Sequence, residues 1–239
     1  LLTVPEGGKP LLGYVNGAEV KNLNIYGQKI NGYGLVNDLH GVNLSGSAIV
    51  IDNVALKSGS STLKSGLIGA EIDKHFNSYA GASAGFTVTV RNCTIEKDVV
   101  VGYDGTQSEI GSFAGRMQGT VENCVSYATV KGVHYVGGII GTKDNALGDC
   151  TVNNCTFGGT VEASGNNAGG IVGGGYNDSS APNGIHVGVK NCAVTKDVAV
   201  SGKENVGGIL GGDEIVAQAW NSYAITDNTF LGKVKGEKN

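Results

Sequence analysis

Gly119–Gly141 reads Gly-Thr-Val-Glu-Asn-Cys-Val-Ser-Tyr-Ala-Thr-Val-Lys-Gly-Val-His-Tyr-Val-Gly-Gly-Ile-Ile-Gly, and variants of this stretch recur along nearly the whole chain. Each copy contains an Asn, and successive Asn residues are separated by 30 to 39 positions. A period of this size is typical of solenoid proteins, in which every repeat forms one turn of a stack. The Asn residues that anchor the copies are Asn22, Asn53, Asn92, Asn123, Asn154, Asn191 and Asn221.

The residues on either side of this Asn alternate between apolar and polar. The positions two before, one after and three after it are mostly apolar, whereas the position immediately before it is mostly polar. Such alternation is the pattern of a strand with one buried face. The buried set changes phase at the Asn, which predicts a bend with the Asn in the left-handed conformation, since Asn tolerates positive φ better than most residues. Stacked bends would let the Asn side chains hydrogen-bond from coil to coil.

A second signature closes each copy, namely a short apolar segment between glycines. It predicts a small strand with a tight bend at both ends. Three short strands per repeat, with no room for a helix between them, predict an all-β fold. We expect a right-handed parallel β-helix, or solenoid, of about seven coils stacked about 4.8 Å apart. The glycine-flanked segments are Gly66–Gly69, Gly111–Gly115, Gly137–Gly141, Gly169–Gly173 and Gly207–Gly211.

Gly137–Gly141 and its equivalents are similar to the GLUG motif of bacterial surface proteins. The Asn-Cys pair followed by such a segment also resembles the repeats of large, exported, multi-domain proteins of Gram-positive and gut bacteria. The resemblance covers the chain from about Leu11 to Tyr223. It is specific for architecture and weak for activity, because the motif occurs in adhesins, in wall-anchored proteins and beside peptidase domains such as those of IgA-cleaving metalloproteases.

The alternation of apolar and polar positions around the Asn recurs in every copy from Val20 to Ala224, and equivalent positions form columns along the stack. We therefore expect one solenoid domain over residues 1–239. Residues 1–17 are expected to form an N-terminal partial coil or cap, 18–224 the coils, and 225–239 a C-terminal cap or linker. The chain begins Leu-Leu-Thr-Val-Pro, inside an expected coil, which favours a fragment of a larger protein with flanking domains.

Composition and charge argue against two classes of partner. With 41 Gly, 3 Pro and 6% aromatic residues, the chain suits short strands, tight bends and an aliphatic interior. A net charge of −4 and a pI of about 5.5 provide no basic surface for nucleic acid. No run of about 18 apolar residues occurs, so we expect no membrane span. The resemblance implies an extracellular protein at the cell surface, associated with the cell wall.

Four of the five cysteines fall in one inward column, directly after the Asn. We expect all five to be buried free thiols that pack as small hydrophobic groups. Disulfides between coils are disfavoured because parallel side chains in a packed column do not reach the required torsion. A metal site is disfavoured because one column gives a line of sulfur atoms and no tetrahedral cluster. The column is formed by Cys93, Cys124, Cys155 and Cys192, and Cys150 lies in a neighbouring inward column.

Several insertions follow the glycine-flanked strands and are expected to emerge at one corner of the rod. Loops on one edge of a solenoid often form binding sites. The alternatives are a solvated polar edge and a calcium site, since a hard cation takes oxygen ligands from adjacent loops. No segment has the regular Asp spacing of a calcium loop, so we expect no cofactor, with calcium as the open alternative. The candidate ligand-facing residues are Asp73, His75, Asp104, Asp144, Asp149, Asp178 and Asp213.

A β-helix that cleaves polysaccharides would need paired carboxylates in a groove, or a base beside bound calcium. The outward column that contains Asp52 and Glu122 alternates in sign and holds no acidic pair. His134 and His186 are expected at ordinary surface positions. The sequence therefore predicts no catalytic residues and no enzymatic activity.

Together these observations predict a non-catalytic extracellular β-helical stalk or adhesin module of a bacterial surface protein, which presents its loops for binding. The alternative is a carbohydrate-binding or polysaccharide-processing β-helix domain. The expected partners are a host or microbial surface protein or glycan, and flanking domains of the same chain.

Overall fold

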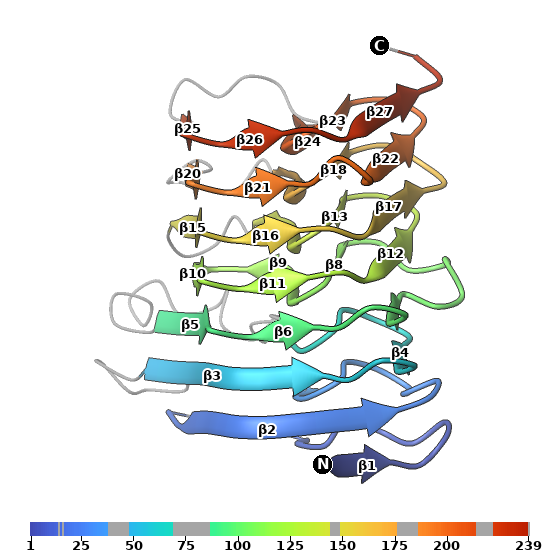
Figure 1. Ribbon diagram of the computed structural model, residues 1–239, viewed down its shortest axis with the longest axis vertical. Coiled ribbons are helices and arrows are strands. Elements are labelled where there is room, and N and C mark those ends of the chain that lie inside the picture. The colour runs from blue at the N-terminus through green and yellow to red at the C-terminus, as the bar shows by residue number, and fades with distance from the viewer. Residues whose placement is uncertain are drawn as a thin grey trace, which may run out of the picture.

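The structure is a computed structural model that describes residues 1–13, 15, 17–37, 48–68, 87–143, 149–175, 186–213 and 222–238. These residues form a right-handed parallel β-helix, in which the chain rises by one level with every coil (Figure 1). Among the residues just named, the structure contains strands and turns but no helix. The predicted fold class is confirmed.

The strands form four sheets that run along the axis of the rod. The first sheet, called the front sheet here, contains β1 (Leu2–Val4), β2 (Glu19–Gly27), β3 (Ala48–Leu56), β5 (Thr87–Arg91), β6 (Thr94–Ile95), β10 (Gly119–Glu122), β11 (Val125–Ser126), β15 (Cys150–Asn153), β16 (Thr156–Phe157), β20 (His186–Lys190), β21 (Ala193–Val194), β25 (Ser222–Thr226) and β26 (Thr229–Phe230). The second contains β4 (Ser61–Thr62), β7 (Val100–Val101), β12 (Thr129–Gly132), β17 (Thr160–Ala163), β22 (Ala199–Gly202) and β27 (Lys233–Gly236). The third contains β8 (Ile110–Gly111), β13 (Val136–Gly137), β18 (Ala168–Gly169) and β23 (Val206–Gly207). The fourth contains β9 (Ala114–Met117), β14 (Ile140–Lys143), β19 (Val172–Gly175) and β24 (Leu210–Asp213).

A full coil contains five short strands, and the prediction of three is wrong. The coil that begins at β10 passes through β11, β12, β13 and β14 before β15 starts the next level (Figure 1). Two bends account for the difference. The bend at Asn123 separates β10 from β11, and the bend at Gly138 and Ile139 separates β13 from β14. The backbone direction changes at both bends, so one predicted strand becomes two.

Equivalent residues stack directly above one another. Val121 pairs with Val90 on one side and with Val152 on the other. Val152 in turn pairs with Val189, and all four side chains are fully buried. The interior is therefore built of ladders of like aliphatic side chains, as the alternation in the sequence predicted.

The last coil departs from the predicted register. Ile225 pairs with Val189, which places Asp227 above Asn191. The φ of Asp227 is 57°, the same conformation that the Asn residues adopt at this bend. Asn221 was the predicted anchor, and it lies outside the described residues. The prediction missed Asp227 because no Asn-Cys pair marks the bend there, although Asp also tolerates the left-handed conformation.

Within residues 225–239, the segment expected as a C-terminal cap or linker, β26 and β27 continue the stack of strands. Phe230 pairs with Val194, and Val234 pairs with Val200. The lysines that suggested a linker, Lys233 and Lys235, flank Val234 in an alternating pattern. Such alternation is the pattern of a half-buried strand.

Glycine is required in the glycine-flanked segments because the backbones approach closely there. A Cβ on Gly138 would lie 2.1 Å from the carbonyl oxygen of Gly170 and 2.6 Å from the Phe157 ring. No side chain fits between these groups. The repeated Gly-Gly pair therefore reflects tight contact between successive coils and with the core.

The Asn residues occupy the outer side of the front-sheet bend. Their φ angles lie between 51° and 57°, as predicted, and their side chains are exposed. Asn53 Nδ2 donates to Asn22 Oδ1 (2.8 Å). Asn92 Nδ2 donates instead to Asp52 Oδ1 (2.8 Å), so the expected ladder is divided into separate contacts. The described members are Asn22, Asn53, Asn92, Asn123, Asn154 and Asn191.

The cysteines occupy the inner side of the same bend and serve backbone groups there. Cys124 Sγ lies 3.7 Å from the carbonyl oxygen of Val90, to which its S–H donates, and it accepts from Cys93 N (3.4 Å). In the last coil Asn228 makes equivalent contacts. Its Nδ2 donates to a carbonyl oxygen one coil below (2.7 Å), and its Oδ1 accepts from Cys192 N (2.8 Å). The thiol column therefore supplies hydrogen bonds as well as volume.

All five cysteines are buried free thiols. Burial raises the pKa of the Cys150 thiol to about 12. Burial is also the main cause that raises the pKa of Cys124. Near neutral pH these two thiols keep their protons, because a thiolate would lose its hydration inside the rod.

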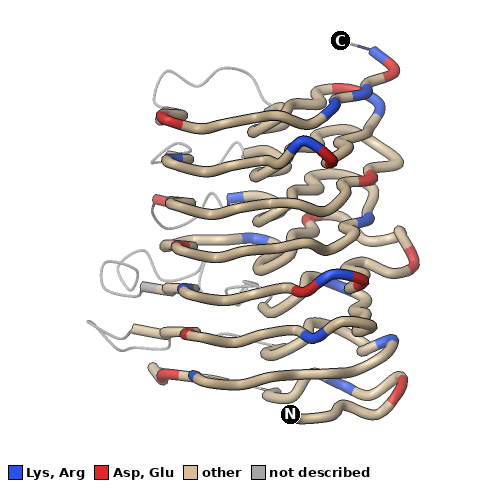
Figure 2. Tube along the Cα trace, viewed as in Figure 1, with Lys and Arg blue, Asp and Glu red and all other residues tan. Residues whose placement is uncertain are grey.

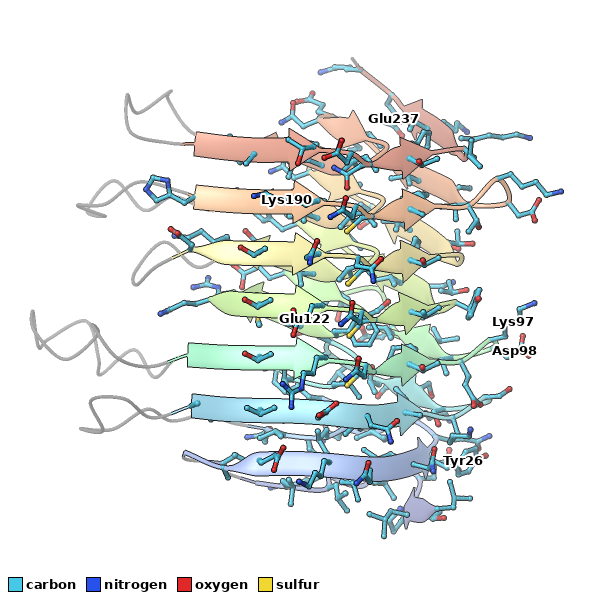
Figure 3. The ribbon with its side chains drawn as sticks, turned by 60° about the vertical axis from the view of Figure 1, so that its left-hand side comes forward. Tyr26, Lys97, Asp98, Glu122, Lys190 and Glu237 are labelled. Carbon is cyan, nitrogen blue, oxygen red and sulfur yellow. The ribbon has the colours of Figure 1, made fainter. Side chains whose placement is uncertain are left out.

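Charged side chains are spread along the outside of the rod. Basic side chains (Lys or Arg) and acidic side chains (Asp or Glu) are spread along the length of the rod, and both signs occur together (Figure 2). Glu122 and Lys190 lie on the front sheet, while Lys97 and Asp98 lie in a turn at its edge (Figure 3). Arg91 of one coil pairs with Asp52 of the coil below (2.9 Å). Such pairs between coils support the register of the stack.

Candidate ligand-binding cleft

The structure divides the predicted loop residues between two corners of the rod. Asp104 lies in the turn between β7 and β8, where its Oδ1 accepts from Thr106 N (3.0 Å) and its Oδ2 from Thr106 Oγ1 (2.8 Å). Asp149 lies directly before β15, and Asp213 is the last residue of β24. The structure therefore does not bring Asp104 together with the other two. The remaining candidates, Asp73, His75, Asp144 and Asp178, lie outside the described residues.

Asp149 borders a shallow depression of about 340 Å³ on the front sheet. The depression also contacts His186, Gly188 and Lys190 of the next coil. Gly188 opens it, since a Cβ there would meet nothing closer than Thr151 at 3.6 Å.

Within the described parts of the chain, no group of three or more His, Cys, Asp or Glu residues could hold a metal ion. No described helix is long and apolar enough to cross a membrane.

A smaller and more polar cleft, of about 190 Å³, lies where the first three coils meet on the side of the third and fourth sheets. Its residues come from separate parts of the chain, which the stacking of coils brings together. We call it the Glu109 cleft. The lining residues are Tyr33, Lys64, Gln107, Ser108, Glu109, Ile110, Gly115 and Arg116.

An ion pair between Arg116 and Glu109 forms one wall of the Glu109 cleft. Arg116 Nε donates to Glu109 Oε2 (2.5 Å), and Arg116 Nη2 donates to Glu109 Oε1 (2.6 Å). The two side chains are 26% and 23% exposed, so the pair is partly shielded from water. The guanidinium fork holds both carboxylate oxygens in fixed positions.

Glu109 holds a backbone conformation that is unusual for its residue type. Its φ is 61°, and the equivalent residues in the next three coils, Tyr135, Asn167 and Asn205, also have positive φ. Asn suits this conformation, and Asn205 Nδ2 donates to Asn167 Oδ1 (2.9 Å). A Glu at this position costs of order 1–3 kcal/mol, and such strain is concentrated at functional sites.

The segment that carries Glu109 is fixed to the neighbouring coil. Glu109 N donates to the carbonyl oxygen of His134 (2.8 Å). Ser108 Oγ accepts from His134 N (3.3 Å), which leaves the Ser108 O–H able to donate to a ligand. The wall of the cleft is therefore positioned before any ligand arrives.

Lys64 and Tyr33 also line the cleft. Lys64 Nζ lies 5.3 Å from the centre of the Tyr33 ring, within the range of a cation–π contact. Tyr33 is 8% exposed, so its ring is part of the fixed surface. Among the described residues, no carboxylate pairs with the Lys64 ammonium group.

Sequence reasoning missed the Glu109 cleft, although one signal for Glu109 was present. The residue two positions before the glycine-flanked segment is Asn167 in one coil and Asn205 in the next, so Asn marks a second bend. Glu109 and Tyr135 stand in the same column and break that rule. Comparing this column would have identified Glu109, whereas nothing local identifies Lys64 or Arg116 as its neighbours.

Comparison with known proteins supports the fold. No protein-family model matches the chain, and no curated protein matches it. A solved structure of a putative immunoglobulin A1 protease from Bacteroides ovatus is similar, with a TM-score of 0.52 and 18% sequence identity. The similarity covers 90% of this chain and 67% of that chain. At this identity it shows a shared fold.

The same comparison contradicts the expectation that the chain has no enzymatic activity. The name of the structural neighbour is that of a protease, which points toward an enzyme. The expectation rested on the absence of an acidic pair in the outward columns, a test that addresses only hydrolysis of polysaccharides. Peptide hydrolysis can also use an activated Ser or Cys or a metal-bound water, which that test does not address, so the expectation is wrong.

Proposed function

We propose that this chain is a β-helical binding module of an extracellular bacterial protein, at the cell surface or secreted, and that it binds a glycan in the Glu109 cleft. The observation that carries the proposal is the partly shielded Glu109–Arg116 pair, held by a strained backbone in a preformed cleft. Binding sites for small ligands combine a few fixed polar groups with aromatic side chains, and Tyr33 is the aromatic residue here.

The architecture supports this role. Coils stack into a rod with close contacts between neighbours, so groups on its surface keep fixed relative positions. The resemblance of Gly137–Gly141 to the GLUG motif favours an exported protein with further domains. The name of the structural neighbour favours a setting in which binding serves proteolysis. We infer that the module holds a glycan-bearing protein for cleavage.

The experiment measures both binding and turnover. Binding of the purified chain to a glycan array, followed by calorimetry with the best ligand, is compared between the native chain and Arg116→Ala. We expect Arg116→Ala to weaken binding at least about tenfold, the loss of one charge-assisted contact. Lys131→Ala is the matched control, because Lys131 forms a similar ion pair with Glu162 (3.1 Å) on the second sheet.

Incubation of the native chain with immunoglobulin A1, and with polysaccharides, tests for cleaved peptide bonds and for new reducing ends. Cleavage that Arg116→Ala slows and Lys131→Ala does not would place turnover at the cleft. Absence of glycan binding in the native chain, or equal binding by both variants, would overturn the proposal.

A further inference from the structure

We infer that the glycan bound in the Glu109 cleft carries a negative charge, as a carboxylate or a sulfate. This inference rests on the proposed function and adds the chemical class of the ligand. It follows from the charges that line the cleft and from the way they are paired.

Among the described residues that line the cleft, Arg116 and Lys64 are cations and Glu109 is the one carboxylate, so positive charges outnumber negative charges by one. Glu109 engages two nitrogens of Arg116, so its carboxylate is taken up by that guanidinium group. The Lys64 ammonium group remains without a carboxylate among the described residues.

This local excess opposes the charge of the whole chain, which is −4. A positive site on a negative protein is not a consequence of composition. The position of Lys64 beside the Tyr33 ring, at 5.3 Å, also places the ammonium group against a low-dielectric surface. Charge interactions there are stronger than in bulk water, so an anionic group is favoured over a neutral hydroxyl.

The remaining groups of the cleft suit a sugar. Ser108 provides a hydroxyl that is free to donate, and Gln107 Nε2 donates to Thr106 Oγ1 (3.0 Å), which orients the amide. The cleft, at about 190 Å³, is smaller than the roughly 300–1,000 Å³ of most small-molecule sites, which favours a small group such as a single sugar ring.

The test uses three pairs of saccharides that share a sugar backbone and differ in a charged group. They are oligogalacturonate and its methyl ester, sialyllactose and its methyl ester, and a heparin oligosaccharide and its desulfated form. We expect the native chain to bind the charged member of at least one pair about tenfold more tightly or better, and we expect added salt to reduce this ratio.

Two variants locate the charge that is responsible. Lys64→Gln keeps a polar side chain of similar length and is expected to bring the ratio close to one. Lys131→Gln, which changes the charge of the chain equally, is expected to leave the ratio unchanged. The thermal unfolding temperature of each variant is measured to show that both are folded.

The outcomes separate the inference from the proposed function. Equal binding of charged and neutral members would overturn the inference and leave glycan binding in place. Binding of no glycan, in these pairs or on the array, would overturn both. Tighter binding of poly-glutamate than of any saccharide would retain the anion and overturn the sugar. A ratio that changes equally in Lys64→Gln and Lys131→Gln would remove the assignment to this cleft.

Discussion

At the scale of single residues, the front-sheet bend divides its work between two side chains. The Asn at the bend adopts positive φ at low cost and faces solvent. The Cys that follows faces the interior, where its S–H and sulfur serve backbone groups of the neighbouring coil. Asn228 replaces the Cys in the last coil and keeps both contacts. From Cys93 to Asn228 the side chain at this position therefore supplies hydrogen bonds at the inner side of the bend, whereas the apolar Leu23 and Val54 occupy it in the first two coils.

The bend conformation leads to a prediction for Asn123. Asn123→Ala should lower the free energy of unfolding by about 1–2 kcal/mol, because alanine pays the full steric cost of a left-handed φ. Asn123→Gly should change it by less than about 0.5 kcal/mol, since glycine adopts this φ freely. Urea unfolding measures both. The matched control is Asn24→Ala, at an exposed strand position outside the positive-φ set. Equal losses for Asn123→Ala and Asn24→Ala would contradict this account.

The buried thiol of Cys150 leads to a prediction about alkaline pH. Its pKa is raised from 9.0 to about 12 in the folded chain. Below pH 9 the thiol is protonated in both states, and its proton contributes no pH dependence. Between about pH 9 and 12 only the unfolded chain loses the proton. Stability should therefore fall by about 1.4 kcal/mol per pH unit for this thiol across that range.

The measurement is urea unfolding from pH 8 to 10.5, with Cys150→Val as the comparison. Val187, directly above Cys150 in the same column, shows that valine fits this type of position. Cys150→Val should show a smaller loss of stability with rising pH than the native chain. Identical pH profiles would show that the Cys150 proton is not held by the fold.

At the scale of elements, the glycine-flanked strands set how closely coils pack. The third and fourth sheets meet at these strands, and the backbones there leave no room for a side chain. Gly188 on the front sheet has more room, since a Cβ there would meet nothing closer than 3.6 Å. Gly138 and Gly188 therefore differ in their surroundings, and substitutions should separate them.

We expect Gly138→Ala to lower the free energy of unfolding by about 3 kcal/mol, or to prevent folding, since its Cβ would lie 2.1 Å from a backbone oxygen. Gly188→Ala should be neutral or stabilising by up to about 1 kcal/mol, because the nearest atom is at 3.6 Å and alanine suits a strand better than glycine. Circular dichroism and urea unfolding test both. A destabilising Gly188→Ala variant would contradict the open spacing.

At the scale of the whole molecule, stability is distributed along the axis. Each coil is held mainly by its two neighbours, so a coil with one neighbour has fewer contacts. Among the described strands, β25, β26 and β27 pair with a neighbouring coil on one side. Val234 is 42% exposed there, whereas its partner Val200 one coil below is fully buried.

Hydrogen exchange should reveal this gradient. Backbone amides of β11, β16 and β17 should exchange much more slowly than those of β26 and β27, because opening the last coil disrupts one interface and opening a central coil disrupts two. Mass spectrometry of peptides after exchange measures the difference. Uniform protection along the axis would indicate that the rod unfolds as a single unit.

The sequence alone determined the coil, the inward and outward columns, the left-handed Asn and the buried cysteines. These follow from local alternation and bend chemistry, which act over a few residues and repeat often enough to be read. It did not determine the number of strands per coil or the register of the last coil. Those depend on where the backbone turns, and at Asp227 the turn occurs without its usual residues.

The Glu109 cleft was decided by the tertiary structure alone. Tyr33, Lys64 and the Glu109–Arg116 pair lie far apart in the sequence, and they meet because coils of different length stack in parallel register. The strain at Glu109 likewise exists only because its column forces positive φ on whichever residue occupies it. Contacts of this kind depend on the summed geometry of several coils, which no local pattern records.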